Sequence, residues 1–257
     1  MAWWGTLLGG TLGYMFGGPL GALLGAALGR NFDRGLSVTD KHAGFDVGQQ
    51  QRVQAAFFTT TFSVMGHIAK ADGEVTKDEI AATESIMSQM RLDPQQRKAA
   101  IQLFNEGKKP TFPLHDVLNQ FRTECHRRRN LVQMFLEIQI ATAMADGTLH
   151  PKEKRIIFSI GAELGFSHAD IEHLFSLGGP QQPSREPGRS LAQAYKILDV
   201  DKSATDAAVK KAYRRLMSQH HPDKLIAKGL PEEMIRLATE KTQTIRSAYE
   251  QIMDSRH

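Results

Sequence analysis

The sequence predicts an all-α protein in which a single transmembrane helix is followed by a helical bundle and a three-helix domain containing an antiparallel helical hairpin. Three observations support this fold class. An uncharged, glycine-rich segment begins the chain, apolar residues recur at helical spacing through most of the remainder, and two glycine-containing segments interrupt that spacing. The expected parts are a transmembrane helix (1–30), a linker (31–49), a helical bundle (50–176), a second linker rich in glycine and proline (177–190) and a C-terminal domain (191–257).

The first element is the predicted transmembrane helix. Residues 2–29 contain no charged side chain, and at about 1.5 Å of rise per residue a helix of this length extends about 40 Å, enough to cross a bilayer with some tilt. The chain opens with Met-Ala-Trp-Trp and lacks the basic start of a secretory signal peptide, so we expect the segment to be retained. Arg30 and Arg34 lie on its C-terminal side, and the positive-inside rule then places the N-terminus outside and the rest of the chain in the cytoplasm.

Glycines recur at every fourth position along this segment. Residues four apart form a row on one helix face, and a row of glycines is a groove in which a second backbone can approach closely. We therefore predict a homodimer formed through this groove. Two alternatives are a flexible glycine-rich stretch and a re-entrant or peripheral segment containing Pro19. The glycines are Gly5, Gly9, Gly13, Gly17, Gly21, Gly25 and Gly29.

The predicted bundle contains an internal repeat. The sequence Ala69-Lys-Ala-Asp-Gly73 recurs 74 residues later as Ala143-Met-Ala-Asp-Gly147, and each copy follows apolar residues at helical spacing. Asp93 and Ser167 occupy equivalent positions and suit the N-caps of a following helix. The repeat therefore predicts helix, turn and helix in each half, with the two halves packed through their apolar faces.

The Asp-Gly turns of the repeat contain carboxylates, which are common ligands of calcium. A calcium-binding EF-hand loop needs about five oxygen ligands at alternate positions and a glutamate at its twelfth position, and neither turn supplies them. We therefore interpret both turns as glycine-assisted helix connections and predict no metal site. The pattern as a whole resembles the tellurite-resistance TerB-like domain, whose members carry acidic residues at such turns. This resemblance leaves a weak metal site open as an alternative, with candidate ligands Asp72, Asp78, Asp146 and Glu153.

The C-terminal domain is predicted to contain three helices. The first spans 191–198, the second is capped by Ser203 or Thr205 and carries an apolar stripe, and the third begins near Pro231. The second and third helices form an antiparallel hairpin whose tip is the segment 220–224. The face of the second helix opposite its apolar stripe is basic, with Lys210, Lys211, Arg214 and Arg215.

Four blocks of this domain resemble the J domain in order and spacing. They are Ala194-Tyr-Lys-Ile-Leu198, Val209-Lys-Lys-Ala-Tyr-Arg-Arg-Leu216, His221-Pro-Asp-Lys224 and Ile245-Arg-Ser-Ala-Tyr249. The resemblance implies a co-chaperone that stimulates the ATPase of a DnaK-type chaperone. With its membrane segment and TerB-like bundle, the whole chain resembles the membrane-anchored DnaJ-like co-chaperones of Gram-negative bacteria. That resemblance implies the inner membrane, a periplasmic N-terminus and a link to envelope or capsule-synthesis signalling.

The candidate partner-binding site is the hairpin tip together with the basic helix that leads to it. Pro222 fixes one backbone dihedral and lacks an N–H, which sets the directions of its neighbours. The resemblance implies that Asp223 pairs with an arginine of the DnaK-type chaperone and that His221 helps to orient it. It also implies that the basic face speeds the encounter with an acidic surface of the chaperone. The expected contact residues on the basic helix are Lys210, Lys211, Tyr213, Arg214 and Arg215.

Several features depart from common J domains. Thr242 stands where the family often has an apolar residue, and Gly229 lies in the loop before the third helix, so we expect the packing beneath the tip to differ. Neither a Gly/Phe-rich segment nor a zinc finger follows the domain, so general client delivery is not expected. His220 and His221 are adjacent and point in different directions, and no third ligand accompanies them, so we interpret His220 as a core residue rather than a metal ligand.

The composition limits the classes of protein and of binding partner that remain. The 257 residues are 41% hydrophobic with both charge signs well represented, which excludes wholesale disorder. A net charge of +4 is compatible with nucleic acid, anionic lipid or an acidic protein, and the J-domain resemblance favours the protein, so no nucleic-acid partner is expected. Cys125 is the single cysteine, which excludes an intramolecular disulfide and favours a reducing compartment.

The sequence also bears on catalysis. It contains no phosphate-binding glycine loop, no nucleophile motif and no convincing carboxylate pair. We therefore predict neither an enzyme nor a cofactor site, and expect a regulatory co-chaperone whose partner performs the chemistry. The alternative is a membrane scaffold or sensor in which the TerB-like domain binds a partner or a metal and the J domain is accessory.

Overall fold

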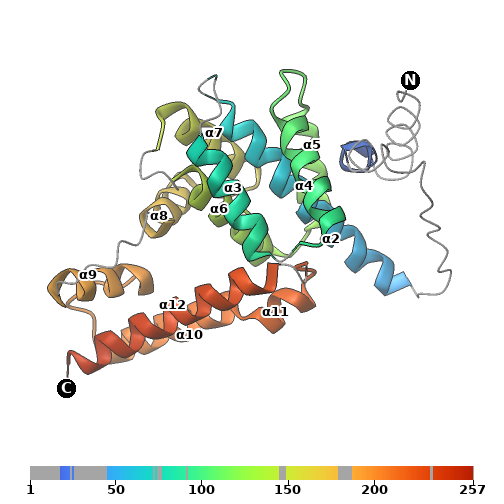
Figure 1. Cartoon of the computed structure of the whole chain (residues 1–257). Coiled ribbons are helices and arrows are strands. Elements are labelled where there is room, and N and C mark those ends of the chain that lie inside the picture. The colour runs from blue at the N-terminus through green and yellow to red at the C-terminus, as the bar shows by residue number, and fades with distance from the viewer. Residues whose placement is uncertain are drawn as a thin grey trace, which may run out of the picture.

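A computed structural model describes residues 18–23, 25, 45–71, 73, 77–90, 92–144, 149–178, 187–231 and 234–256. Within these ranges the chain forms helices and turns and no strand, which confirms the predicted all-α fold. The helices are α2 (Phe45–Ala69), α3 (Lys77–Gln89), α4 (Pro94–Gly107), α5 (Leu114–Glu124), α6 (Arg129–Ala143), α7 (Pro151–Glu163), α8 (His168–Gly178), α9 (Pro187–Leu198), α10 (Asp206–His220), α11 (Pro222–Ala227) and α12 (Ile235–Asp254). Figure 1 shows α2 to α8 gathered in one bundle, with the hairpin of α10 and α12 lying along its side.

Helix α2 is central to the bundle. It contacts α4, α5, α6 and α7, and Phe57 near its middle is fully buried against Phe121 of α5, with 6.0 Å between the ring centroids. Phe121 in turn packs on Phe135 of α6 at a centroid distance of 4.9 Å. Because each aromatic side chain removes a large apolar area from water, this row contributes strongly to the stability of the bundle.

The crossing of α2 and α4 depends on two glycines. A Cβ atom on Gly66 would lie 2.0 Å from the carbonyl oxygen of Phe104, and one on Gly107 would lie 1.7 Å from the carbonyl oxygen of Ser63. These distances are far inside van der Waals contact, and the atoms met belong to helix backbone, which cannot turn aside as a side chain can. The two helices therefore approach this closely only because both positions are glycine.

Both halves of the internal repeat have the predicted arrangement. Helices α2 and α3 flank the first Asp-Gly turn, and α6 and α7 flank the second. The Asp93 carboxylate accepts hydrogen bonds from two backbone N–H groups at the start of α4, so Asp93 is the N-cap of that helix, as predicted. The Ser167 hydroxyl accepts a hydrogen bond from the Asp170 N–H in the first turn of α8. Within the turns, residues 72, 74–76 and 145–148 lie outside the described residues.

The predicted transmembrane helix and first linker fall mostly outside the described residues, as do the predicted dimer glycines other than Gly21 and Gly25. In the described part, Leu20 is buried against the bundle, and its backbone N–H donates a hydrogen bond to the Gln120 side chain at 2.8 Å. None of the described helices is both long and apolar enough to cross a membrane. Helix α2 begins at Phe45, so helical structure starts inside the segment predicted as a linker.

The C-terminal domain contains the three predicted helices and one more. Helices α10 and α12 form the antiparallel hairpin, and α9 packs on α12 (Figure 1). Thr205 caps α10, as predicted, by accepting a hydrogen bond from the Ala208 N–H at 3.3 Å. The additional helix, α11, occupies the tip, and α12 begins at Ile235 rather than near Pro231. The buried core residues of the domain are Ala194, Tyr195, Leu198, Val209, Leu216, Ile245, Ala248 and Ile252.

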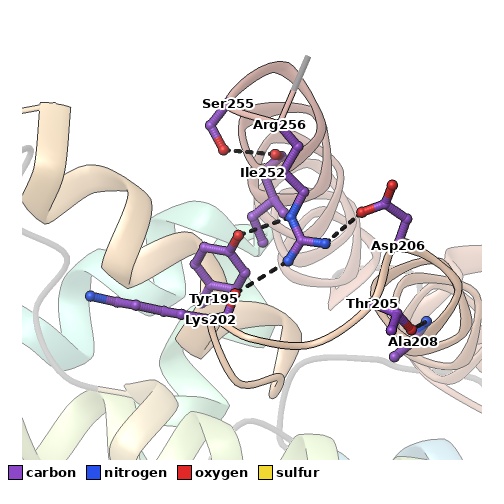
Figure 2. Close-up of polar contacts among 8 residues, drawn as sticks. All are labelled: Tyr195, Lys202, Thr205, Asp206, Ala208, Ile252, Ser255 and Arg256. Atoms are coloured by element: carbon purple, nitrogen blue, oxygen red, sulfur yellow. Dashed lines mark hydrogen bonds and ion pairs between the residues drawn. The ribbon is translucent and has the colours of Figure 1, made fainter.

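Arg256 connects three elements at the end of the hairpin opposite the tip. Figure 2 shows its guanidinium between the hydroxyl of Tyr195 on α9 and the carboxylate of Asp206 on α10, at 3.0 and 2.5 Å. A third contact reaches the backbone carbonyl oxygen of Lys202 at 3.5 Å. Because Arg256 follows the last turn of α12, these contacts fix the end of α12 against the other two helices.

The bundle and the C-terminal domain are in direct contact near the tip. The Asn130 side chain donates a hydrogen bond to the backbone carbonyl oxygen of Gln219 at 3.2 Å, and the Gln50 side chain donates one to that of Ile226 at 3.5 Å. Apolar residues of α11, α12 and the loop between them join the core of the bundle. These residues are Leu225, Leu230, Met234 and Ala238.

Candidate functional site

The predicted tip residues form the junction of two helices. His221 follows the last residue of α10 and is the N-cap of α11, where its Nδ1 atom accepts a hydrogen bond from the Asp223 N–H at 3.2 Å. A ring nitrogen that accepts from an N–H carries no proton, so the neutral imidazole of His221 has its proton on Nε2. Pro222 is the first residue of α11, where its fixed dihedral suits the helix and its missing N–H leaves no donor unpaired.

The Asp223 carboxylate projects into solvent. Its side chain is 86% exposed, against 45% for His221. The neighbouring Lys224 ammonium donates a hydrogen bond to the Ser218 hydroxyl at 2.7 Å, back across the tip to α10. The cation next in sequence is therefore engaged elsewhere, and the Asp223 carboxylate is open to solvent, with Nδ1 of His221 3.9 Å from its Oδ2 atom.

The basic residues of α10 occupy the solvent-facing side of the helix that ends at the tip. Lys210, Lys211 and Arg214 are exposed, and Arg215 is exposed while forming an ion pair with Asp199 at 3.1 Å. The two adjacent pairs, 210/211 and 214/215, are four residues apart, which places them on one broad helical face, as the sequence predicted.

Tyr213, the remaining predicted contact residue, has a different environment. Its ring stacks on that of Tyr249 on α12, with 4.3 Å between centroids and 19° between ring planes, and is partly buried. Aromatic pairs at this separation stabilise the elements that carry them. The side chain of Tyr213 therefore contributes to holding the two hairpin helices together, and only its exposed edge is open to a partner.

A partly buried charged cluster lies directly behind the tip, with the Lys241 side chain 30% exposed and that of Glu137 15% exposed. The Glu137 carboxylate of α6 is 3.4 Å from the Lys241 ammonium of α12 and 3.7 Å from Nε2 of His220, and it accepts a hydrogen bond from the Gln133 side chain at 2.9 Å. His220 is buried, as expected of a core residue. The sequence did not reveal that its acidic neighbour, Glu137, comes from the bundle.

The charge states of this cluster follow from its surroundings. Burial raises the pKa of Glu137, but Lys241 and His220 outweigh burial and hold that pKa below its usual value. Burial lowers the pKa of His220, and the nearby Glu137 carboxylate only partly offsets the effect. The ion pair is therefore between Glu137 and Lys241, and His220 packs beside it, with its charged form disfavoured by burial.

A cleft of about 370 Å³ lies between the bundle and the C-terminal domain. Most of the charged side chains that line it are paired with an oppositely charged neighbour, so the cleft has no strong excess of one charge. The ion pairs at the cleft are Arg129 with Asp170, Arg215 with Asp199 and Lys241 with Glu137. Of these pairs only Lys241 with Glu137 joins the bundle to the C-terminal domain, and the pattern does not indicate a bound ion.

The four acidic residues of the metal alternative are only partly described. Glu153 is buried in the first turn of α7, where its carboxylate accepts a hydrogen bond from the His150 N–H at 3.1 Å in a capping box. Asp72, Asp146 and the Asp78 side chain lie outside the described residues. In the part of the chain that is described, no three His, Cys, Asp or Glu side chains gather as a metal site.

Two functional features were missed in the sequence. The short helix α11 was predicted only as a tip, although Pro222 is a recognisable signal for the first position of a helix. The role of Glu137 was also missed. A charged residue between the buried Leu136 and Ile138 in an apolar stretch was the available signal, because a buried carboxylate requires a partner.

Comparisons with known proteins match the three parts in the predicted order. The family model for the co-chaperone DjlA transmembrane domain matches residues 1–41, that for the tellurite resistance protein TerB matches 59–175, and that for the DnaJ domain matches 193–257. The match at 1–41 supports a membrane anchor, and the other two confirm the TerB-like and J-domain resemblances.

Curated relatives named co-chaperone protein DjlA resemble the chain over most of its length. The relative from Yersinia pestis is 42% identical over 98% of both chains, and that from Coxiella burnetii is 46% identical over 79% of both. The relative from Vibrio vulnificus strain CMCP6 is 43% identical, covering 86% of this chain and 87% of its own. No solved structure matches.

Proposed function

This chain belongs to the DjlA family of co-chaperones, and from that premise we propose that it recruits a DnaK-type chaperone to the inner membrane and stimulates its ATPase through the His221-Pro222-Asp223 tip. The observation that carries the proposal is the exposed Asp223 carboxylate, held at the start of α11 next to a basic helix face. The partner's active site performs the hydrolysis, and this chain supplies the contact that triggers it.

Each part of the tip has a role in this mechanism. Asp223 pairs with an arginine of the chaperone, and such a charge-assisted contact gains strength when docking excludes water from it. His221 and Pro222 set the direction of the carboxylate by capping and starting α11. The exposed cations of α10 attract an acidic chaperone surface, which raises the association rate more than the final affinity.

The test is the steady-state ATPase of a purified DnaK-type chaperone with the full chain in lipid nanodiscs. Asp223→Asn keeps the shape of the side chain and removes its charge, so stimulation should fall by about thirtyfold, as expected for a lost charge pair of about 2 kcal/mol. Asp254→Asn, the same change at the exposed far end of α12, is the matched control and should stimulate normally. Equal stimulation by both variants contradicts the proposal.

The proposal includes the membrane arrangement. The chain crosses the inner membrane once, with a periplasmic N-terminus and cytoplasmic domains, and pairs with a second copy through its row of glycines. The family match at 1–41 and the charge-free segment support the anchor, and the fourfold glycine spacing supports the pairing. Replacing Gly13, Gly17 and Gly21 with Leu should abolish self-association in membranes, and unchanged association would refute the pairing. A link to envelope or capsule-synthesis signalling is a prediction from the family resemblance.

A further inference from the structure

The hairpin has two hydrophobic halves that belong to different cores. The half near the chain end packs on α9 and contains Ile245, Ala248 and Ile252. The half near the tip contains Leu225, Leu230 and Met234, which are at most 1% exposed and join the core of the bundle instead. The elements that carry the tip are therefore buried by another domain of the same chain.

Thr242 marks the boundary between the two halves. It lies on α12 between Ala238, which packs with the bundle, and Ile245, which packs with the C-terminal domain. Thr242 is buried, and its hydroxyl donates a hydrogen bond to the Thr239 carbonyl oxygen at 2.8 Å, so it satisfies its own polar group locally. A polar residue at this position supplies little hydrophobic contact, and the apolar support beneath the tip comes from the bundle.

Gly229 allows the loop after α11 to approach the bundle closely. Its φ is +94°, a value that other residues rarely adopt, and a Cβ atom there would lie 2.8 Å from Cγ1 of Val53 on α2 and 3.2 Å from a guanidinium nitrogen of Arg128. Both the positive φ and the lack of room for a Cβ atom therefore favour glycine at this position. A contact between the C-terminal domain and the bundle therefore explains why Gly229 departs from common J domains.

Polar contacts fix the same region from the side of α6. Asn130 binds the carbonyl oxygen of Gln219, and Glu137 contacts His220 and Lys241. Gln219 and His220 are the last two residues of α10 and directly precede the tip. We call this set the docking interface: Val53, Asn130 and Glu137 of the bundle with Gly229, Gln219, His220 and Lys241 of the C-terminal domain.

We propose that the bundle is a structural support for the tip and that Glu137, acting through His220 and Lys241, is a positioning residue for Asp223. The docking interface immobilises the end of α10 and the whole of α11, and thereby holds the Asp223 carboxylate in one direction. The carboxylate and the cations Lys210 and Lys211 remain exposed. Docking therefore orients the partner-binding face and leaves it open.

Two consequences can be measured. Without docking, the chaperone must order the tip on binding, so a higher concentration of this chain is needed for half-maximal stimulation while the maximal rate is kept. Backbone amides of residues 219–231 also lose protection from hydrogen exchange. The local opening that exposes these amides no longer has to break the docking interface, so it costs less free energy. The effect on the chaperone rests on the proposed function, and the exchange measurement is independent of it.

The experiment uses the full chain in nanodiscs with Glu137→Gln, which keeps the side-chain shape and leaves the partly exposed Lys241 without its ion-pair partner. We expect exchange at residues 219–231 to rise by about tenfold or more, with residues 57–68 of α2 unchanged, and the half-maximal concentration to rise severalfold. Glu106→Gln is the matched control, since Glu106 pairs with Lys109 on the surface of the bundle, and it should change neither quantity.

Each outcome decides the inference. Unchanged exchange at residues 219–231 overturns the docking, and faster exchange with an unchanged half-maximal concentration overturns the positioning role of Glu137. If residues 57–68 also lose protection, Glu137→Gln has destabilised the bundle itself. Asn130→Ala then replaces it, and the same two quantities, exchange at residues 219–231 and the half-maximal concentration, are measured. If the unsubstituted chain fails to stimulate the chaperone while the exchange result holds, the proposed function fails and docking stands.

Discussion

Gly229→Ala is the substitution whose cost can be worked out most fully from the structure. The new methyl group would lie 2.8 Å from Cγ1 of Val53, more than half an ångström inside ordinary carbon contact. Val53 is fully buried in α2, so it has no open space into which to move. Alanine must also adopt the φ of +94° that the loop requires.

These two effects have different magnitudes. Forcing a non-glycine residue into a positive φ costs about 1–2 kcal/mol, and overpacking a filled core adds about 1–3 kcal/mol. We expect Gly229→Ala to destabilise docking by about 2–5 kcal/mol in total, which corresponds to at least about thirtyfold faster exchange of the amides in residues 219–231. The tip should thus become locally mobile while the bundle stays folded.

Gly165→Ala is the matched control for the backbone term. Gly165 has a φ of +84° in the turn after α7, and a Cβ atom there meets nothing within 4 Å. Its substitution should cost only the backbone term of about 1–2 kcal/mol and leave residues 219–231 protected. Hydrogen exchange followed by mass spectrometry on the full chain measures both variants. Protection at residues 219–231 that is equal in Gly229→Ala and the unsubstituted chain would refute the reasoning.

The remaining predictions concern the bundle, the far end of the hairpin and pH. Gly66→Ala should lower the stability of the bundle by about 2–4 kcal/mol, because its methyl group meets the backbone of α4; a denaturant titration that matches the unsubstituted chain would contradict this. Arg256→Ala should increase amide exchange at the ends of α9 and α12 without affecting the tip, and the reverse pattern would contradict the role in Figure 2. His220 and Glu137 both have pKa values lowered by their folded surroundings, so both stabilise docking above their ordinary pKa values of 6.5 and 4.5 and lose that stabilisation as the pH falls. Protection factors at residues 219–231 should therefore decrease below pH 6.5, and protection that increases on acidification would contradict the sign.

The features that the sequence predicted correctly depend on local patterns. Asp93 and Thr205 are recognisable caps because a capping side chain bonds N–H groups only two or three residues away. Lys210 and Arg214 were placed on the exposed face of α10 because helical periodicity assigns faces without knowledge of the rest of the fold. Local rules therefore identified most of the helices and the exposed basic face of α10.

The features that were missed depend on contacts between distant parts of the chain. His220 was correctly interpreted as buried, but its neighbour Glu137 comes from α6, and no local rule pairs the two. Gly229 was noticed as unusual, and its cause, the approach to Val53, becomes visible only when α2 and the loop are seen together. Where one domain covers the surface of another, the pattern of apolar residues shows that the surface is buried but does not identify the domain that covers it.

The central claim is that the tip of the hairpin triggers hydrolysis in a DnaK-type chaperone. The most direct test is the single-turnover rate constant for ATP already bound to the purified chaperone, measured with the full chain in nanodiscs and with its His221→Gln, Asp223→Asn double variant. We predict that the unsubstituted chain raises the rate constant by about tenfold or more and that the double variant leaves it near the unstimulated value. Equal acceleration by both chains would contradict it.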